Sequence, residues 1–126
     1  MLLALIAVPS VSIAEPEPRF DHEQFCIAAQ DIERRANADE GTWLDDYTRH
    51  EGMTVDCEMR AVELRLYVQV PFKDIPGNWQ DRVHRQWSDD YCTDPAWAAS
   101  IAQRWKIVLT IRSVGSEQFS ARADCH

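Results

Sequence analysis

Residues 62–70 alternate between apolar and polar side chains, and this alternation constrains the fold more than any other feature of the sequence. The apolar members are Val62, Leu64, Leu66, Val68 and Val70. A period of two places every second side chain on the same face of a strand, so the run predicts a strand with one buried and one exposed face. The chain is therefore expected to build a sheet that is covered on one side only.

The same period recurs in three other segments. Met53, Val55 and Cys57 alternate with polar residues, and residues 105–111 and 119–125 repeat the pattern. The short link over residues 58–60 indicates that the first two strands form an antiparallel pair.

Three segments show helical spacing instead. Asp21 and Gln24 form a capping-box pattern before the first segment, and Asp94 with Pro95 provides a start signal for the third. The apolar stripes comprise Phe25, Ala28, Ala29, Ile32 and Ala36, then Trp79, Val83, Trp87 and Tyr91, then Trp97 and Ile101. The order αββααββ predicts an α+β two-layer sandwich, a four-stranded antiparallel sheet with about three helices on one face. Trp79, Trp87, Trp97 and Trp105 are predicted to lie in its core.

The four cysteines are expected to form two disulfides, because their number is even and no two are spaced as CxxC. Cys57 and Cys125 fall on the apolar face of the sheet, against which the helices bearing Cys26 and Cys92 would pack. The separations also repeat, 57 − 26 = 31 and 125 − 92 = 33 residues. The pairs Cys26–Cys57 and Cys92–Cys125 are therefore preferred, although the sequence leaves the other two pairings open.

The first fourteen residues are uncharged, and residues 2–8 are continuously apolar. Ser12 and Ala14 supply small residues at a signal-peptidase site, so residues 1–14 are interpreted as a signal peptide. No Lys or Arg precedes the apolar run. Either the true start lies upstream of Met1, or the segment is a buried N-terminal strand. We expect residues 15–20 to be a Pro-rich lead-in, residues 21–126 to form one domain, and the protein to be periplasmic or secreted.

Charge limits the classes of partner. The chain carries 13 Lys and Arg against 21 Asp and Glu, a formal net charge of −8. An acidic chain is repelled by nucleic-acid phosphates and anionic headgroups, so neither nucleic acid binding nor membrane insertion of the mature chain is expected. If charge guides association, it favours a cationic protein partner.

Scattered positions resemble a group of small exported bacterial proteins of unknown function. The first half contributes Gly41-Thr42-Trp43-Leu44-Asp45, Thr48-Arg49 and the run from Gly52-Met53 to Cys57. The second half contributes Trp87, Cys92, Trp97, Trp105-Lys106 and Cys125, and the match spans most of residues 25–125. Arg104 departs from the pattern, because glycine is expected before the Trp-Lys pair. The resemblance implies export and an α+β fold with Trp-rich helices and two disulfides, and it implies no activity.

The densest group of functional side chains lies between the first predicted helix and the sheet, over residues 43–51. Loops carried on a rigid scaffold often hold binding residues. The candidate binding residues are Trp43, Asp45, Asp46, Arg49 and His50. Trp43 is the tryptophan without a periodic role, so it is the preferred contact residue. A solvated connector held by surface salt bridges is the simpler interpretation of the same residues.

No catalytic motif stands out, so a non-catalytic accessory, inhibitor or immunity-type module of the bacterial envelope is the leading hypothesis. The alternative is a small hydrolase of envelope glycans with Asp45 or Asp46 as acid or base. Possible metal ligands are Asp21, His22, Glu23, His50, His84 and His126, but they form no known ligand motif. The sequence therefore predicts no metal site and no cofactor, and it leaves the oligomeric state open.

Overall fold

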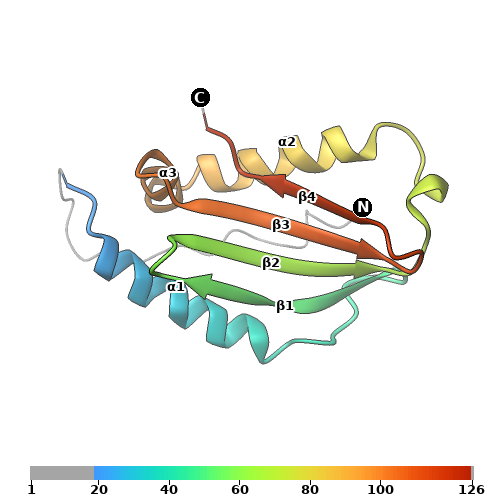
Figure 1. Ribbon diagram of the computed structural model, residues 1–126, viewed down its shortest axis with the longest axis horizontal. Coiled ribbons are helices and arrows are strands. Elements are labelled where there is room, and N and C mark those ends of the chain that lie inside the picture. Colours follow the sequence, from blue (N-terminus) through green and yellow to red (C-terminus); the bar gives the residue numbers. More distant parts are fainter. Residues whose placement is uncertain (1–18, 126) are drawn as a thin grey trace.

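The alternating segments form a four-stranded sheet with helices behind one face (Figure 1). This computed structural model describes residues 19–125, so the predicted signal peptide and most of the lead-in lie outside the described residues. The elements are α1 (His22–Asn37), β1 (Thr48–Asp56), β2 (Ala61–Val68), the short 3-10 helix η2 (Phe72–Asp74), α2 (Trp79–Cys92), α3 (Pro95–Ala102), β3 (Lys106–Ser113) and β4 (Gln118–Arg122). The predicted α+β class and the order of its helices and strands are confirmed.

The sheet is mixed, and the expectation of a fully antiparallel sheet is wrong at its centre. The strand order is β1-β2-β3-β4, in which the outer pairs are antiparallel and β2 runs parallel to β3. The connection between β2 and β3 contains η2, α2 and α3, which return the chain to the end of the sheet where β2 began. A parallel neighbour requires such a crossover, whereas a hairpin produces an antiparallel neighbour.

The apolar face of the sheet packs against the three α-helices. All four tryptophans that were predicted to be buried are at most 5% exposed. Phe25 of α1 contacts both Trp97 and Trp105 edge-on, with ring centroids 5.3 and 4.8 Å apart. Trp87 donates its indole N–H to the backbone oxygen of Ile107, 3.0 Å away. The core therefore satisfies the polar edge of this indole while it buries the ring.

Both preferred disulfides are present. Cys26 of α1 bonds to Cys57, which follows β1, and Cys92 at the end of α2 bonds to Cys125, which follows β4. The Cα atoms are 5.7 and 5.5 Å apart, within the usual range for a disulfide. Each bond closes a loop of ordinary size and stabilises the fold by about 3–4 kcal/mol in the chain-entropy model.

Side chains of α1 cover the outer edge of β1. The Asn37 amide donates to the Met53 carbonyl at 3.0 Å and accepts from the Met53 N–H at 2.7 Å. Glu33 accepts a hydrogen bond of 2.7 Å from the N–H of Val55. These contacts occupy backbone groups that would otherwise lie open at a sheet edge, where foreign strands can pair.

We predict that Asn37→Ala lowers the free energy of unfolding by about 1–3 kcal/mol, because both backbone groups of Met53 lose their partner. Urea unfolding of the oxidised protein measures the change. Asn78→Ala is the matched control, since Asn78 is exposed and its side chain makes no capping bond to α2. Equal stability of the Asn37→Ala variant and the parent would show that the helix does not hold this edge.

Candidate functional site: a stack of aromatic and arginine side chains

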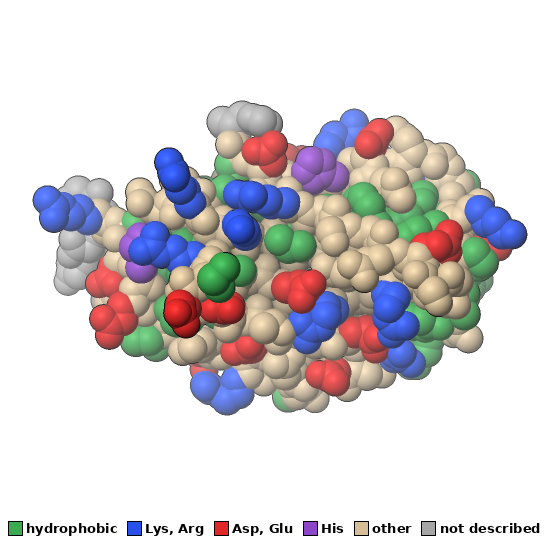
Figure 2. All heavy atoms as spheres, in the orientation of Figure 1, with side chains coloured by type: hydrophobic (Ala, Val, Ile, Leu, Met, Phe, Trp, Pro, Cys, Tyr) green, Lys and Arg blue, Asp and Glu red, His purple; other side chains and the backbone are tan. Residues whose placement is uncertain are grey.

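The face of the sheet that the helices leave uncovered is polar and charged. In the alternating register it carries Arg49, Glu51, Thr54 and Asp56 from β1, Ala61, Glu63, Arg65 and Tyr67 from β2, Lys106, Val108, Thr110 and Arg112 from β3, and Gln118, Ser120 and Arg122 from β4. Figure 2, which views the molecule as Figure 1 does, shows acidic and basic side chains interspersed over these strands. We call this surface the open face.

Four side chains at one end of the open face form a continuous stack. The guanidinium carbon of Arg49 lies 5.5 Å from the centroid of the Trp43 ring and 4.7 Å from that of Tyr67. The guanidinium of Arg112 lies over the same Tyr67 ring at 5.0 Å. Aromatic rings and cations therefore alternate, an arrangement that the negative faces of the rings favour. We call Trp43, Arg49, Tyr67 and Arg112 the aromatic–arginine stack.

Strand register brings the four residues together. Trp43 forms an isolated antiparallel bridge with Arg49, Arg49 is opposite Tyr67, and Tyr67 is level with Arg112 across the parallel pair of β2 and β3. Adjacent strands lie about 4.8 Å apart, which is the spacing needed for flat side chains to stack across a sheet. The place of Arg112 in the stack therefore depends on the parallel register at the centre of the sheet.

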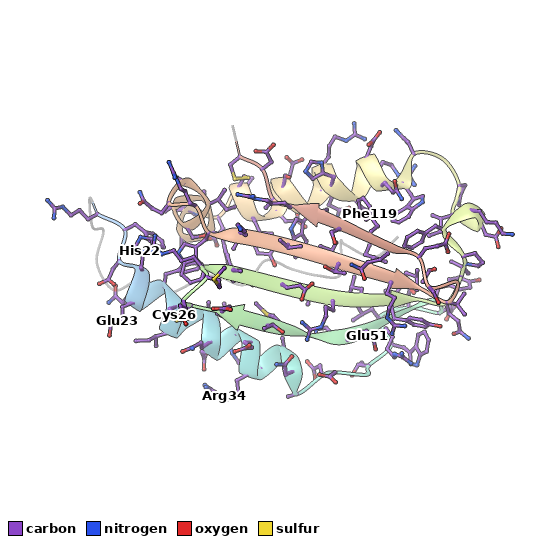
Figure 3. The ribbon with its side chains drawn as sticks, viewed as in Figure 1. His22, Glu23, Cys26, Arg34, Glu51 and Phe119 are labelled. Carbon is purple, nitrogen blue, oxygen red and sulfur yellow. A yellow bond between two sulfur atoms is a disulfide. The ribbon has the colours of Figure 1, made fainter. Side chains whose placement is uncertain are left out.

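Glu51, which is labelled in Figure 3, joins the two arginines of the stack. One carboxylate oxygen accepts from Arg49 Nε at 3.1 Å, and the other accepts from Arg112 Nη2 at 2.6 Å. Partial burial raises the pKa of Glu51, but the hydrogen bonds and charges of Arg112 and Arg49 outweigh it and leave the pKa below its ordinary value. The carboxylate therefore stays ionised and holds both guanidinium groups in place.

A shallow hollow of about 220 Å³ adjoins the stack. It is lined by Glu51, Glu63, Arg65, Leu66, Thr110, Arg112 and Gln118. Arg65 donates to Glu63 at 3.1 Å, and Thr110 donates to the other oxygen of Glu63 at 2.7 Å. The charged side chains that line the hollow are therefore paired with one another.

The structure separates the predicted binding residues. Trp43 is 45% exposed and belongs to the stack together with Arg49. Asp45 instead accepts hydrogen bonds of 2.8 Å from the backbone N–H groups of Tyr47 and Thr48, which shapes the turn into β1. Asp46 is exposed. Neither aspartate lines the hollow beside the stack, which contains Glu51 and Glu63.

His50 is on the other side of β1 from the stack. It is opposite Leu66, whose side chain is buried, whereas its neighbour Arg49 is opposite Tyr67 on the open face. His50 Nδ1 accepts a hydrogen bond from the N–H of Gly52 at 3.0 Å. Burial lowers the pKa of His50, and the nearby Asp39 and Glu40 oppose that effect only in part. This histidine therefore supports the local backbone instead of contacting the stack.

Tyr67 and Arg112 belong to the site, and the sequence did not single them out. Tyr67 is a non-core member of the alternating residues 62–70 and Arg112 follows residues 105–111, and such positions are found on any exposed strand face. The pairing of β1 with β2 and of β2 with β3 makes them neighbours of Arg49. This register could not be deduced from the sequence without knowing that β2 and β3 are parallel.

The described residues contain no group of three or more His, Cys, Asp or Glu side chains placed to hold a metal ion. None of the helices within residues 19–125 has the length and apolarity needed to cross a bilayer.

Comparison with a solved structure supports the fold. No protein-family model matches this sequence, and no curated protein does. The chain is similar to a protein of Pseudomonas aeruginosa described as a "putative secreted protein", with a TM-score of 0.62 and 12% sequence identity. The alignment covers 86% of this chain and 96% of the other. This similarity agrees with the resemblance to small exported bacterial proteins, and at this identity it establishes the shared fold alone.

We predict that Glu51→Gln lowers the free energy of unfolding at neutral pH by about 1 kcal/mol, since two partly exposed ion pairs are lost. The pKa of Glu51 is lowered in the folded protein, so its contribution is present above the ordinary pKa and disappears as the pH falls through the folded value. Urea unfolding at a series of pH values should show the two proteins converging in acid. Glu58→Gln, an exposed control, should follow the parent, and a gap that persists in acid would contradict the assignment.

A second pH effect follows from His50. Its folded-state pKa lies below the ordinary 6.5, so protonation favours the unfolded chain. The parent should lose stability as the pH falls from 6.5 toward the folded pKa, and His50→Asn, which keeps an acceptor for the Gly52 N–H but does not titrate, should lose less. Thermal unfolding at closely spaced pH values measures this, with His84→Gln as the control. Identical slopes for the parent and His50→Asn would contradict the prediction.

Proposed function

We propose that this chain is an exported, non-catalytic module that binds another protein through the aromatic–arginine stack. Export is supported by the predicted signal peptide of residues 1–14, by the two disulfides, and by the similarity to a protein described as secreted. The roles that fit such a module are an accessory, an inhibitor or an immunity factor of the bacterial envelope, in the periplasm or outside the cell.

The observation that supports binding is the composition and order of the stack. Trp, Tyr and Arg are the residue types most enriched among residues that dominate protein–protein interfaces. Here they are partly exposed, and the side chain of Arg112 is 51% exposed, yet Glu51 and the ring contacts already hold the two arginines. A side chain that is ordered before association loses less conformational entropy when a partner binds.

The geometry gives less support to the glycan hydrolase. A general acid at neutral pH needs a raised pKa beside its substrate. The pKa of Asp90 is raised, by burial and by the neighbouring Asp89, but Asp90 lies on α2, behind the sheet. Glu51, which does line the hollow, has a lowered pKa and is held by two arginines.

Affinity capture from a cell-envelope extract tests the binding module. The oxidised mature protein is expected to retain a partner at near-equal stoichiometry, and Trp43→Ala should weaken that capture by at least about tenfold, the effect of losing a dominant interface residue. Ile27→Ala, which removes an apolar side chain that is 61% exposed on α1, should not weaken it. Equal capture by the parent, Trp43→Ala and Ile27→Ala would rule out the stack as the binding surface.

A further inference from the structure

Four basic side chains gather at the end of the open face opposite the stack. They are Arg60, Arg104, Lys106 and Arg122, which we call the basic corner. The N–H of Lys106 donates to the carbonyl of Arg60 at 2.9 Å, and Arg122 of β4 is opposite Val108, on the same face as Lys106. Figure 2 shows Lys and Arg side chains collected over the start of β3 and the end of β4. Residues far apart in the sequence thus place four cations at one end of the sheet, beside the three carboxylates of Asp56, Glu58 and Asp124.

The cations of the basic corner have no ionic partners among residues 19–125. Within residues 19–125, five of the thirteen Lys and Arg residues form salt bridges, and none of the five belongs to the basic corner. They are Arg34, Arg35, Arg49, Arg65 and Arg112. Of the remaining eight (13 − 5), four make up the basic corner. In a chain with 21 acidic residues, unpaired cations concentrated at one place are unexpected from composition alone.

Two of these arginines also occupy backbone conformations that disfavour them. Arg60 has φ of 53° and Arg104 has φ of 72°, both in the left-handed region. Glycine takes this region without steric cost, and arginine does not. Strained backbone of this kind tends to be kept where a side chain has a function. At the turn before β3, Arg104 thus takes a left-handed conformation at the position where the resemblance leads us to expect glycine.

We propose that the basic corner binds an acidic segment of the partner protein, an inference that rests on the proposed binding function. The strands of the open face carry five cations (Arg49, Arg65, Lys106, Arg112 and Arg122) and three carboxylates (Glu51, Asp56 and Glu63), so the face has a charge of 5 − 3 = +2. Adding Arg60 and Arg104 together with the flanking Glu58 and Asp124 leaves that balance unchanged. The open face thus has a charge opposite in sign to the net charge of −8.

This proposal differs from the expectation drawn from composition, which favoured a cationic partner. Steering depends on the potential over the surface that docks, and not on the net charge of the whole molecule. The carboxylates interspersed on the open face would repel a continuous polyanion such as a nucleic acid or an anionic membrane surface. A protein segment, in contrast, can place single carboxylates beside Arg60, Arg104 and Lys106.

The test uses a matched pair of fluorescein-labelled peptides with the same apolar residues, one with glutamates and the other with lysines at the same positions. Fluorescence anisotropy should show that the oxidised mature protein binds the glutamate peptide more tightly and that added salt weakens this binding. The double variant Arg60→Gly/Arg104→Gly should bind the glutamate peptide about fivefold to tenfold more weakly, as expected for two exposed charge contacts. The control Arg82→Gln/Arg85→Gln, which also removes two cations without salt bridges, should bind as the parent does.

Unfolding of the same glycine variant provides a second readout. It should unfold at a higher urea concentration than the parent, because glycine takes the left-handed conformation at both positions without steric cost. Its affinity for the glutamate peptide should fall at the same time. Gain of stability with loss of affinity separates a binding role from a structural one.

Three results would overturn the inference: preference for the lysine peptide, equal binding of both peptides, or binding of phosphatidylglycerol vesicles without binding of the glutamate peptide. None of them would affect the capture experiment with Trp43→Ala, so failure of the basic corner can be distinguished from failure of the binding function.

Discussion

The parallel pairing of β2 with β3 is the contact on which the rest of the molecule depends. It joins two halves, α1 with β1 and β2, and α2 and α3 with β3 and β4, each closed by its own disulfide. Eight residues of β2 are paired with eight of β3, from Ala61 and Lys106 to Val68 and Ser113. One side of this ladder buries the alternating aliphatic side chains beneath the helices, and the other side positions Tyr67 and Arg112 for the stack. The pairing register of β2 and β3 therefore determines both which side chains are buried in the core and which lie side by side in the stack.

Much of the fold could be predicted because it depends on local periodicity. Helical spacing, capping residues and alternation located all the major helices and strands, and the similar cysteine separations of 31 and 33 residues favoured the disulfide pairs that are present. The direction of β3 relative to β2 could not be predicted in this way, since alternation is the same in parallel and antiparallel strands. Only the path of the crossover through η2, α2 and α3 decides that direction.

The candidate site was predictable only in part, for the same reason. The contact between Trp43 and Arg49 could be anticipated because both lie in one short polar segment. The side chain of Asp45, also predicted as a binding residue, accepts backbone hydrogen bonds in the turn before β1. Tyr67, Arg112 and the basic corner come from different strands, and nothing in their local sequence marks them. Net charge averages over both layers of the molecule, whereas the strands of the open face carry their own excess of arginine and lysine.

The two disulfides also determine how this protein would respond to force. Tension applied to the chain ends passes through the disulfide from Cys26 to Cys57 and then through the disulfide from Cys92 to Cys125. The loops that these bonds close therefore carry no tension. Between the outer cysteines, only residues 57–92 can be drawn out, a span of roughly 120 Å at the extended length per residue. That span contains β2 and α2 but neither β3 nor β4. Oxidised protein would thus be much less extensible than its length suggests, and reduction would release the remainder.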